Sequence, residues 1–305
     1  MKVVFAGSPK FAVPALKALC CADGCEVVAV ITQPDKPVGR KQILTPTPVK
    51  AYALERGIEV YDFKKIREHV SKIKALGADI MITCAYGQIL TQEVLDCFPK
   101  GVWNLHASLL PKFRGASPIQ SAILTGESHT GITVMKTELA LDSGDILLVK
   151  RCEIGNRTCG ELSAELSYLA AEAATDAVKY LNSGNIQLLM QDEAGVSFCK
   201  KINKADCKVD FSRSAEEVLR GIKAFSPSPA AYCNLNGSIL NILNADLAEG
   251  SGKCGEVIVC DKLGITVACG KNAICITLLQ PAGGKVMPAR DFVNGRKIKA
   301  GDILD

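Results

Sequence analysis

The chain has 305 residues and a formal net charge of +4, and 48% of its residues are hydrophobic against 22% charged. This composition is typical of a soluble globular protein, and the length predicts two domains. No apolar run approaches the roughly 20 residues that cross a bilayer, which excludes a membrane-spanning protein. The sequence starts on a strand-like segment rather than on a leader peptide, so we expect a cytoplasmic protein.

The first half of the chain alternates apolar strands with helices. The strands expected in chain order are residues 2–7, 26–32, 79–86, 101–108, 131–136 and 145–150, with helices at 14–19 and 49–56. Such a βαβα order predicts an α/β fold with a doubly wound, mostly parallel Rossmann-like sheet. Ligands of these sheets bind at the carboxyl ends of the strands.

A capping box marks the start of a long helix at Thr158, because Glu161 follows three residues later. This helix is expected to end at residues 182–185. The next segment, 191–210, has no clear period and is predicted to contain a linker. A second capping box then starts a short helix after Ser214.

Beyond residue 230 the pattern changes to short strands separated by glycines. Five strands are expected, at residues 231–235, 238–243, 255–260, 265–268 and 273–278. They predict a small antiparallel β-barrel of the OB-like kind, which binds oligonucleotides in some proteins and is purely structural in others. The predicted domains are therefore a Rossmann-like domain over 1–190, a linker over 191–206 and the barrel over 207–305.

The charge excess lies in the C-terminal part of the chain. From Lys200 onward 15 Lys and Arg stand against 11 Asp and Glu, and this difference equals the whole net charge of +4. The excess suits an anionic partner such as RNA, although small excesses are also common on inert surfaces.

The 14 cysteines and three histidines do not indicate a metal site. Most cysteines lie within apolar runs, as Cys84 and Cys260 do, and the sequence has no Cys-x-x-Cys pair. We predict that they are small buried hydrophobic residues, kept reduced in the cytosol.

Two polar side chains at the end of a strand form the candidate catalytic site. Asn104 and His106 alternate along the strand 101–108, so they share one face and can both donate hydrogen bonds to an oxyanion. His106 can also shuttle a proton. Further on, Asp142 lies in the glycine turn 141–145. The alternatives are a structural, half-buried histidine and an aspartate that only holds its turn together.

Signatures of other enzyme classes are missing. The turn Gly7-Ser8-Pro9 after the first strand lacks the further glycines of a dinucleotide fingerprint, which excludes NAD binding. The sequence has no phosphate-binding Gly-Lys-Ser/Thr motif. It also has no Ser-His-Asp or Cys-His arrangement that would activate a nucleophile.

Several segments resemble the methionyl-tRNA formyltransferase family, and the resemblance covers essentially the whole chain. These segments include Phe5-Ala6-Gly7-Ser8-Pro9, Ala85-Tyr86-Gly87, Asn104-x-His106 with Ser108-Leu109-Leu110-Pro111, Arg114 to Gln120, and Leu141-Asp142-Ser143-Gly144-Asp145. The Asn-x-His pair and the Asp turn are shared with folate-dependent formyltransferases in general. One departure is Ser228, where the family often has an aromatic residue, so stacking is not expected at this position.

The resemblance implies 10-formyltetrahydrofolate as the formyl donor, and no metal. It implies Asn104, His106 and Asp142 as the catalytic residues, which hold the oxyanion and move the proton of a neutral attacking amine. The residues expected to bind the folate are Tyr86, Gly87, Gln88, Ile89, Leu90, Ser108, Leu109, Leu110 and Pro111.

The segment 33–48 resembles the loop with which the family engages the acceptor end of tRNA, and the barrel resembles the family's tRNA-contacting domain. Lys36, Arg40 and Lys41 make this segment basic. Its four prolines predict an irregular, mobile arm. We therefore expect a monomer that formylates the α-amino group of methionine on charged initiator tRNA, in translation initiation.

Two alternatives stay open. A related folate-dependent enzyme would pass the formyl group to another acceptor, such as a nucleotide sugar, or to water as a 10-formyltetrahydrofolate hydrolase. A protein of another class would bind RNA through the barrel and catalyse nothing. Formyl transfer that requires charged tRNA distinguishes the first alternative, and folate binding distinguishes the second.

Overall fold

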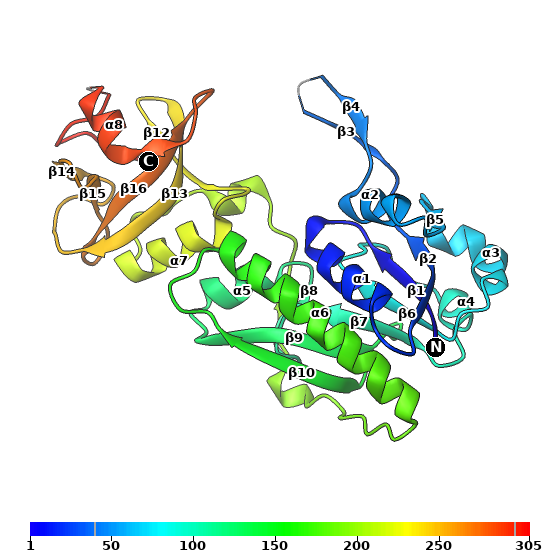
Figure 1. Cartoon of the computed structure of the whole chain (residues 1–305). Helices are drawn as coiled ribbons and strands as arrows, with labels where there is room; N and C mark the ends of the chain where they lie inside the picture. Colours follow the sequence, from blue (N-terminus) through cyan, green and yellow to red (C-terminus); the bar gives the residue numbers. More distant parts are fainter. Residues whose placement is uncertain (40, 296) are drawn as a thin grey trace. The chain divides into compact units, whose positions relative to one another are not determined.

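The computed structural model describes residues 1–39, 41–295 and 297–305, which form two compact units (Figure 1). Unit 1 comprises Met1–Pro118, His129–Glu153 and Ser163–Cys199, and unit 2 comprises Ile119–Ser128, Ile154–Leu162 and Lys200–Asp305. Unit 2 thus takes two short segments from the chain before residue 163. The continuous domain limits expected from the sequence, 1–190 and 207–305 with a linker over 191–206, stay a prediction.

Unit 1 is built on a seven-stranded sheet. Its strands, from one edge to the other, are β10 (Ile146–Glu153), β9 (His129–Lys136), β7 (Val102–His106), β6 (Ile80–Cys84), β1 (Lys2–Gly7), β2 (Glu26–Ile31) and β5 (Val60–Tyr61). The strands from β7 to β5 are parallel, whereas β9 and β10 run antiparallel to their neighbours. This confirms the mostly parallel, Rossmann-like sheet. The strand order reverses between β1 and β6, which is where such sheets bind ligands.

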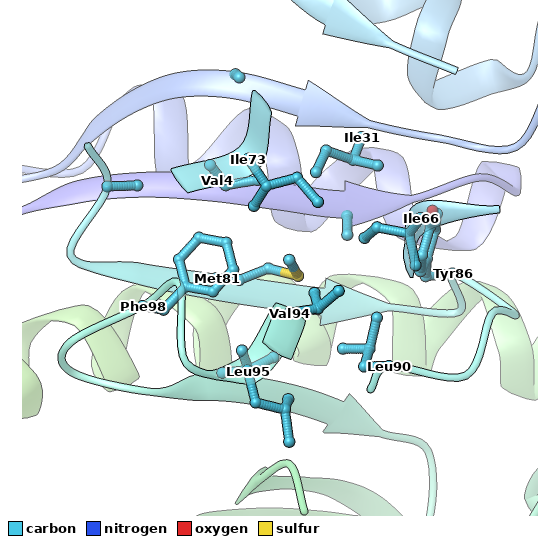
Figure 2. Close-up of a cluster of buried hydrophobic side chains, with 14 of the residues drawn as sticks. Val4, Ile31, Ile66, Ile73, Met81, Tyr86, Leu90, Val94, Leu95 and Phe98 are labelled. Carbon is cyan, nitrogen blue, oxygen red and sulfur yellow. The ribbon is translucent and has the colours of Figure 1, made fainter. Parts of the chain in front are cut away.

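Helices cover the sheet of unit 1. They are α1 (Val13–Cys20), α2 (Pro48–Glu55), α3 (Val70–Ala75), α4 (Gln92–Leu95) and α6 (Cys159–Ser183), which belongs to unit 1 from Ser163 on, with the 3₁₀ turns η1 (Lys10–Ala12) and η2 (Ile66–His69). A buried cluster joins Val4, Ile31 and Met81 of the sheet to Ile73 of α3 and Val94 of α4 (Figure 2). Apolar side chains therefore bury this face of the sheet and hold the strand ends in place.

The predicted start of α6 is confirmed. The hydroxyl of Thr158 accepts a hydrogen bond from the Glu161 backbone at 3.3 Å, and the Glu161 carboxylate accepts one from the Thr158 backbone at 2.8 Å. This pair satisfies backbone N–H groups that the first helical turn leaves free. The buried face of α6 includes Leu162, Leu166 and Ala173, as the spacing of its apolar residues predicts.

The expectation of an irregular arm over residues 33–48 is wrong. β3 (Lys36–Val38) and β4 (Ile43–Thr45) form an antiparallel hairpin, which extends away from the rest of unit 1 in Figure 1. Pro37 is tolerated because a two-stranded sheet consists of edges only. Pro48 is tolerated because it occupies the first turn of α2, where a proline removes no helical hydrogen bond.

Unit 2 contains the expected antiparallel strands. Their order is β12 (Ala231–Leu235), β13 (Ser238–Ala248), β16 (Ala273–Pro281), β15 (Ile265–Ala268) and β14 (Val257–Cys260), with β17 (Met287–Pro288) on β16. The unit also contains α7 (Ala215–Phe225) and α8 (Ala289–Asn294), while α5 (Pro118–Leu124) spans the limit between the units. The capping box of Ser214 with Glu217 at the start of α7 is confirmed.

The last residues of the chain close this sheet. Leu304 donates its backbone N–H to Gly255 next to β14 at 2.8 Å, and Asp305 exchanges backbone hydrogen bonds with Asn234 of β12 at 2.6 and 3.1 Å. Both edges of the sheet are therefore paired with the same short segment, as the barrel prediction requires.

The cysteines differ in burial more than the sequence predicts. Six of the 14 are buried, but Cys20, Cys21 and Cys254 are exposed. Within the described residues no helix is long and apolar enough to cross a membrane.

Candidate active site

Asn104 lies near the carboxyl end of β7 and is held by the neighbouring strand. The hydroxyl of Thr83 on β6 donates a hydrogen bond to Asn104 Oδ1 at 2.9 Å. This contact fixes the orientation of the amide and leaves its NH₂ group as the available donor. His106 lies two residues further on, so its side chain points to the same face of the sheet.

His106 is 5% exposed, and both ring nitrogens face oxygen atoms. Nε2 lies 2.9 Å from the carbonyl oxygen of Phe113, which can only accept, so Nε2 carries a proton. Nδ1 lies 3.6 Å from Asp142 Oδ2. In the imidazolium form both nitrogens are therefore donors, and Asp142 is placed to receive the Nδ1 proton.

The carboxylate of Asp142 is held from a second side. Oδ2 accepts a hydrogen bond from the backbone of Gly115 at 2.8 Å. Asp142 has a left-handed backbone conformation, with φ of 47°, which aspartate tolerates better than most residues. Its carboxylate therefore contacts another loop and the histidine, rather than only its own turn.

The loop after β7 shapes this site through strained and buried groups. Phe113 also has a positive φ, of 61°, which is unusual for a bulky residue and directs its carbonyl at His106. Gly115 is required sterically, because an added Cβ would lie 2.2 Å from the carbonyl oxygen of Cys199. Strain at such positions is typical of functional sites, where the surrounding structure enforces it.

The Ser108–Pro111 segment expected at the folate site has its polar groups engaged within the protein. The hydroxyl of Ser108, which is fully buried, donates to the carbonyl of Lys112 at 2.7 Å. Its own carbonyl accepts from the Thr133 hydroxyl at 2.6 Å. Leu110 is buried, while Leu109 and Pro111 are partly exposed. Ser108 thus stabilises the loop conformation, and the two partly exposed residues are accessible to a ligand.

The segment 86–90 follows β6 at the point where the strand order reverses. Tyr86 and Leu90 belong to the buried cluster of Figure 2. The Gln88 side chain bridges the Ile66 backbone and the Phe63 carbonyl, each at 2.8 Å. Only Ile89, which is 87% exposed, presents a large side chain to solvent. These contacts hold the segment rigid, so its backbone can present fixed groups to a ligand.

One group in this segment lacks a protein partner. Among the described residues, the hydroxyl of Tyr86 is buried and has no hydrogen-bond partner. Burial also raises the pKa of Tyr86 well above its ordinary value. A buried hydroxyl without a partner is energetically costly. It is therefore a candidate to receive a hydrogen bond from a ligand.

The candidate tRNA-binding lysines lie on the hairpin. Lys36 on β3 and Lys41 in the turn are exposed, and Arg40 lies outside the described residues. The only acidic residue of the segment, Asp35, is bound by Lys50 at 2.9 Å. The local surface is therefore cationic, and the Asp35–Lys50 pair fixes the base of the hairpin.

Two residues near the site were not anticipated from the sequence. Gln191 and Arg114 are both buried; Gln191 contacts the loop that carries Asp142, and Arg114 contacts Gln191. Neither belongs to a periodic segment, although Arg114 lies within a stretch that resembles the family. In the described part of the chain no group of three or more His, Cys, Asp or Glu side chains could hold a metal ion.

Comparisons with known proteins identify the class to which this fold and site belong. Residues 1–178 match the formyl transferase family, and residues 201–297 match the C-terminal domain of formyl transferases. Methionyl-tRNA formyltransferase of Neisseria meningitidis serogroup A is 44% identical over 309 residues, which cover 100% of both chains. The enzyme of that name from Chromobacterium violaceum is 41% identical, over 100% of this chain and 99% of its own. This chain belongs to the methionyl-tRNA formyltransferase family.

Solved structures share the fold at lower identity. An N-formyltransferase from Helicobacter canadensis, in complex with folinic acid and dTDP-3-aminofucose, superposes with a TM-score of 0.70. It is 19% identical and covers 90% of this chain and 99% of its own. HypX from Aquifex aeolicus in complex with tetrahydrofolic acid gives a TM-score of 0.65 at 18% identity, over 96% of this chain and 47% of its own.

Proposed function

We propose that this protein transfers the formyl group of 10-formyltetrahydrofolate to the α-amino group of methionine on charged initiator tRNA. The full-length match at 44% identity carries the assignment, and the contact between His106 and Asp142 supports it. Formylmethionyl-tRNA for translation initiation is the product. A cytoplasmic location follows from this function, because charged tRNA is used there, and a monomer stays a prediction.

Asn104, His106 and Asp142 carry the chemistry in this proposal. The neutral amine attacks the formyl carbon, and a new N–C bond forms while the carbonyl oxygen becomes an oxyanion. The Asn104 amide donates a hydrogen bond to that oxyanion, which is worth ~3 kcal/mol for a single donor, and the positive charge of protonated His106 stabilises it further. Asp142 accepts the proton that the attacking nitrogen loses. The bond to the folate nitrogen then breaks, and this nitrogen takes up a proton as it leaves.

The segment 86–90 fits a folate as the bound donor. The pterin ring carries hydrogen-bonding groups on a flat apolar body, and this segment offers a rigid backbone beside the buried cluster. The partnerless hydroxyl of Tyr86 is available for one of those groups. Leu109 and Pro111 are the accessible members of the other expected segment.

The hairpin and unit 2 are the proposed tRNA-binding parts. Lys36 and Lys41 are exposed on the hairpin, and the charge excess of the chain lies beyond Lys200. Phosphate binding needs cations that are accessible and free to approach the backbone. In the sequence, Arg40 is the third basic residue of the hairpin segment.

A formylation assay tests the function. Charged initiator tRNA, charged elongator tRNA and free methionine are compared as acceptors, with 10-formyltetrahydrofolate as donor. We expect rapid transfer to charged initiator tRNA and none to free methionine. Transfer to a dTDP-amino sugar, or hydrolysis of the donor without any acceptor, would instead identify one of the related enzymes.

A further inference from the structure

A buried glutamine holds the loop that carries Asp142. Gln191 is 6% exposed, and its Nε2 donates to the carbonyl oxygens of Asp142 at 3.0 Å and Gly144 at 2.8 Å. On its other side, Oε1 accepts two hydrogen bonds from Arg114, from Nε at 3.1 Å and from Nη2 at 2.9 Å. The guanidinium of Arg114, also buried, reaches Glu193 at 2.9 Å.

The orientation of the Gln191 amide is unambiguous. A guanidinium only donates and carbonyl oxygens only accept, so the amide oxygen must face Arg114 and the nitrogen must face the loop. Each of its two N–H groups then has a carbonyl partner. A buried and fully satisfied polar network of this kind specifies one arrangement, because any other would leave a polar group unpaired.

The loop needs such support because its backbone is strained. Asp142 has φ of 47°, and a left-handed conformation is unfavourable at a residue other than glycine. At Gly144 an added Cβ would lie 1.9 Å from the carbonyl oxygen of Lys136. The side chain of Gln191 contacts the carbonyls of these two residues, so it supports the turn at its strained residue and at its closest backbone approach.

The segment that carries Gln191 is itself fixed to the other loop of the site. β11 (Phe198–Cys199) pairs in parallel with β8 (Arg114–Gly115). The Ser197 hydroxyl accepts from the Phe113 backbone at 2.9 Å, and the Cys199 thiol donates to the Phe113 carbonyl at 3.4 Å. That carbonyl is the one that faces His106 Nε2. Residues 191–199 therefore contact the loops that hold both partners of the His106–Asp142 pair.

We infer that Gln191 is a positioning residue for the formyl transfer reaction: it fixes the backbone of Asp142 so that the carboxylate stays on His106. Arg114 acts one contact further out and fixes the Gln191 amide. This role rests on the proposed function, because it assigns Asp142 the proton of the attacking amine. Neither Gln191 nor Arg114 contacts the reacting atoms in this role.

The decisive variant is Gln191→Glu. It keeps an oxygen for Arg114 but places a second carboxylate oxygen against two carbonyl oxygens, so the loop must move. We expect kcat for charged tRNA to fall about 10- to 100-fold, since a misplacement of 1 Å can cost about 10². KM for both substrates should change less than about threefold. The matched control is Glu193→Gln, which changes the 75% exposed partner of Arg114 and should leave kcat near the parental value.

A double-mutant cycle separates positioning from a merely structural role. In an Asp142→Asn background, Gln191→Glu should lower kcat by less than about threefold, because the group that it positions is already disabled. The same factor in both backgrounds would overturn the inference. So would a Gln191→Glu enzyme that is fully active.

A second variant tests the inference if Gln191→Glu does not fold. Arg114→Lys keeps the charge for Glu193 but replaces the two donors to Gln191 by one, and it should lower kcat in the same direction and show the same loss of effect with Asp142→Asn. Parental kcat in a folded Arg114→Lys protein would then reject the role of the network. If the parental enzyme itself does not formylate charged tRNA, the proposed function fails rather than this inference.

Discussion

The Asp142 loop (residues 137–145) and the β3–β4 hairpin are both connections of the same sheet, but they are stabilised in opposite ways. The Asp142 loop is bound from outside by Gly115, Gln191 and His106. The hairpin is held at its base by the Asp35–Lys50 pair, and its lysines are exposed. Buried polar contacts fix geometry, whereas exposed cations provide long-range attraction that is screened by salt.

This difference predicts which kinetic constant each region controls. Changes near the Asp142 loop should lower kcat, because they misplace groups that act only in the transition state. Changes on the hairpin should raise KM for tRNA and alter its salt dependence, because they remove binding at a distance from the reacting atoms. Substitutions in and around both regions test this division, from the largest expected effect to the smallest.

The largest effect is expected at His106. His106→Ala should lower kcat about 100-fold or more, since both the positive charge that stabilises the oxyanion and a proton carrier are lost. KM for charged tRNA should stay within about threefold of the parental value. Asn104→Ala and Asp142→Asn should lower kcat on a similar scale. Steady-state kinetics with saturating donor measure these changes, and near-normal turnover by His106→Ala would contradict the mechanism.

Gly144→Ala should have the next largest effect. The new Cβ would lie 1.9 Å from the Lys136 carbonyl, so the loop must shift, at a loss of about 1–3 kcal/mol in the free energy of unfolding. We expect kcat to fall about 10- to 100-fold through displacement of Asp142. Gly221→Ala is the control, because nothing lies within 4 Å of its added Cβ. Denaturant unfolding and kcat are measured together, and a destabilised but fully active variant would argue that the loop tolerates movement.

Neutralising the hairpin should affect binding rather than turnover. The combined variant Lys36→Ala, Arg40→Ala and Lys41→Ala should lower kcat/KM for charged tRNA about tenfold, if each charge contributes about 0.5 kcal/mol. The slope of log kcat/KM against log salt should become shallower by about 0.7–0.9 for each lost phosphate contact. Affinity for folate should not change.

A control for that variant removes charge elsewhere on unit 1. Lys17→Ala with Lys74→Ala neutralises two exposed lysines outside the hairpin, and it should alter the salt slope much less. If both variants behave alike across the salt series, the hairpin attracts tRNA only through the overall charge of the protein.

The smallest effect is expected from Tyr86→Phe. Its hydroxyl has no partner among the described residues, so its removal should not destabilise the folate-free protein. Folate affinity should fall about three- to tenfold, which corresponds to one lost hydrogen bond of 0.5–1.5 kcal/mol. Calorimetric titration with folate measures this change, and unchanged affinity would show that the bound pterin does not use the hydroxyl.

The elements that rest on local patterns could be predicted from the sequence. A few neighbouring residues are enough to identify an apolar strand such as 2–7 or a capping box such as Thr158 with Glu161. Asn104 and His106 could be placed on one face of a strand because side chains alternate with a period of two. That Asp142 reaches His106 could only be suggested, since their contact depends on how a long loop folds back.

The hairpin and the Gln191 network could not be predicted, for different physical reasons. The prolines of 33–48 suggest irregular structure, but Pro37 and Pro48 occupy positions where no backbone N–H is needed. Gln191 is 77 residues from Arg114 and 49 from Asp142 in the chain. Isolated polar residues brought together by long-range packing leave no periodic signal in a single sequence.

The closure of unit 2 by residues 301–305 has a consequence for the order of events during synthesis. β12 and β14 pair with this segment, so neither edge can be completed before it has emerged from the ribosome. Until then the nascent unit exposes two open strand edges, which are templates for pairing with other chains. A chaperone that shields such edges should therefore matter most until residues 301–305 have left the ribosome.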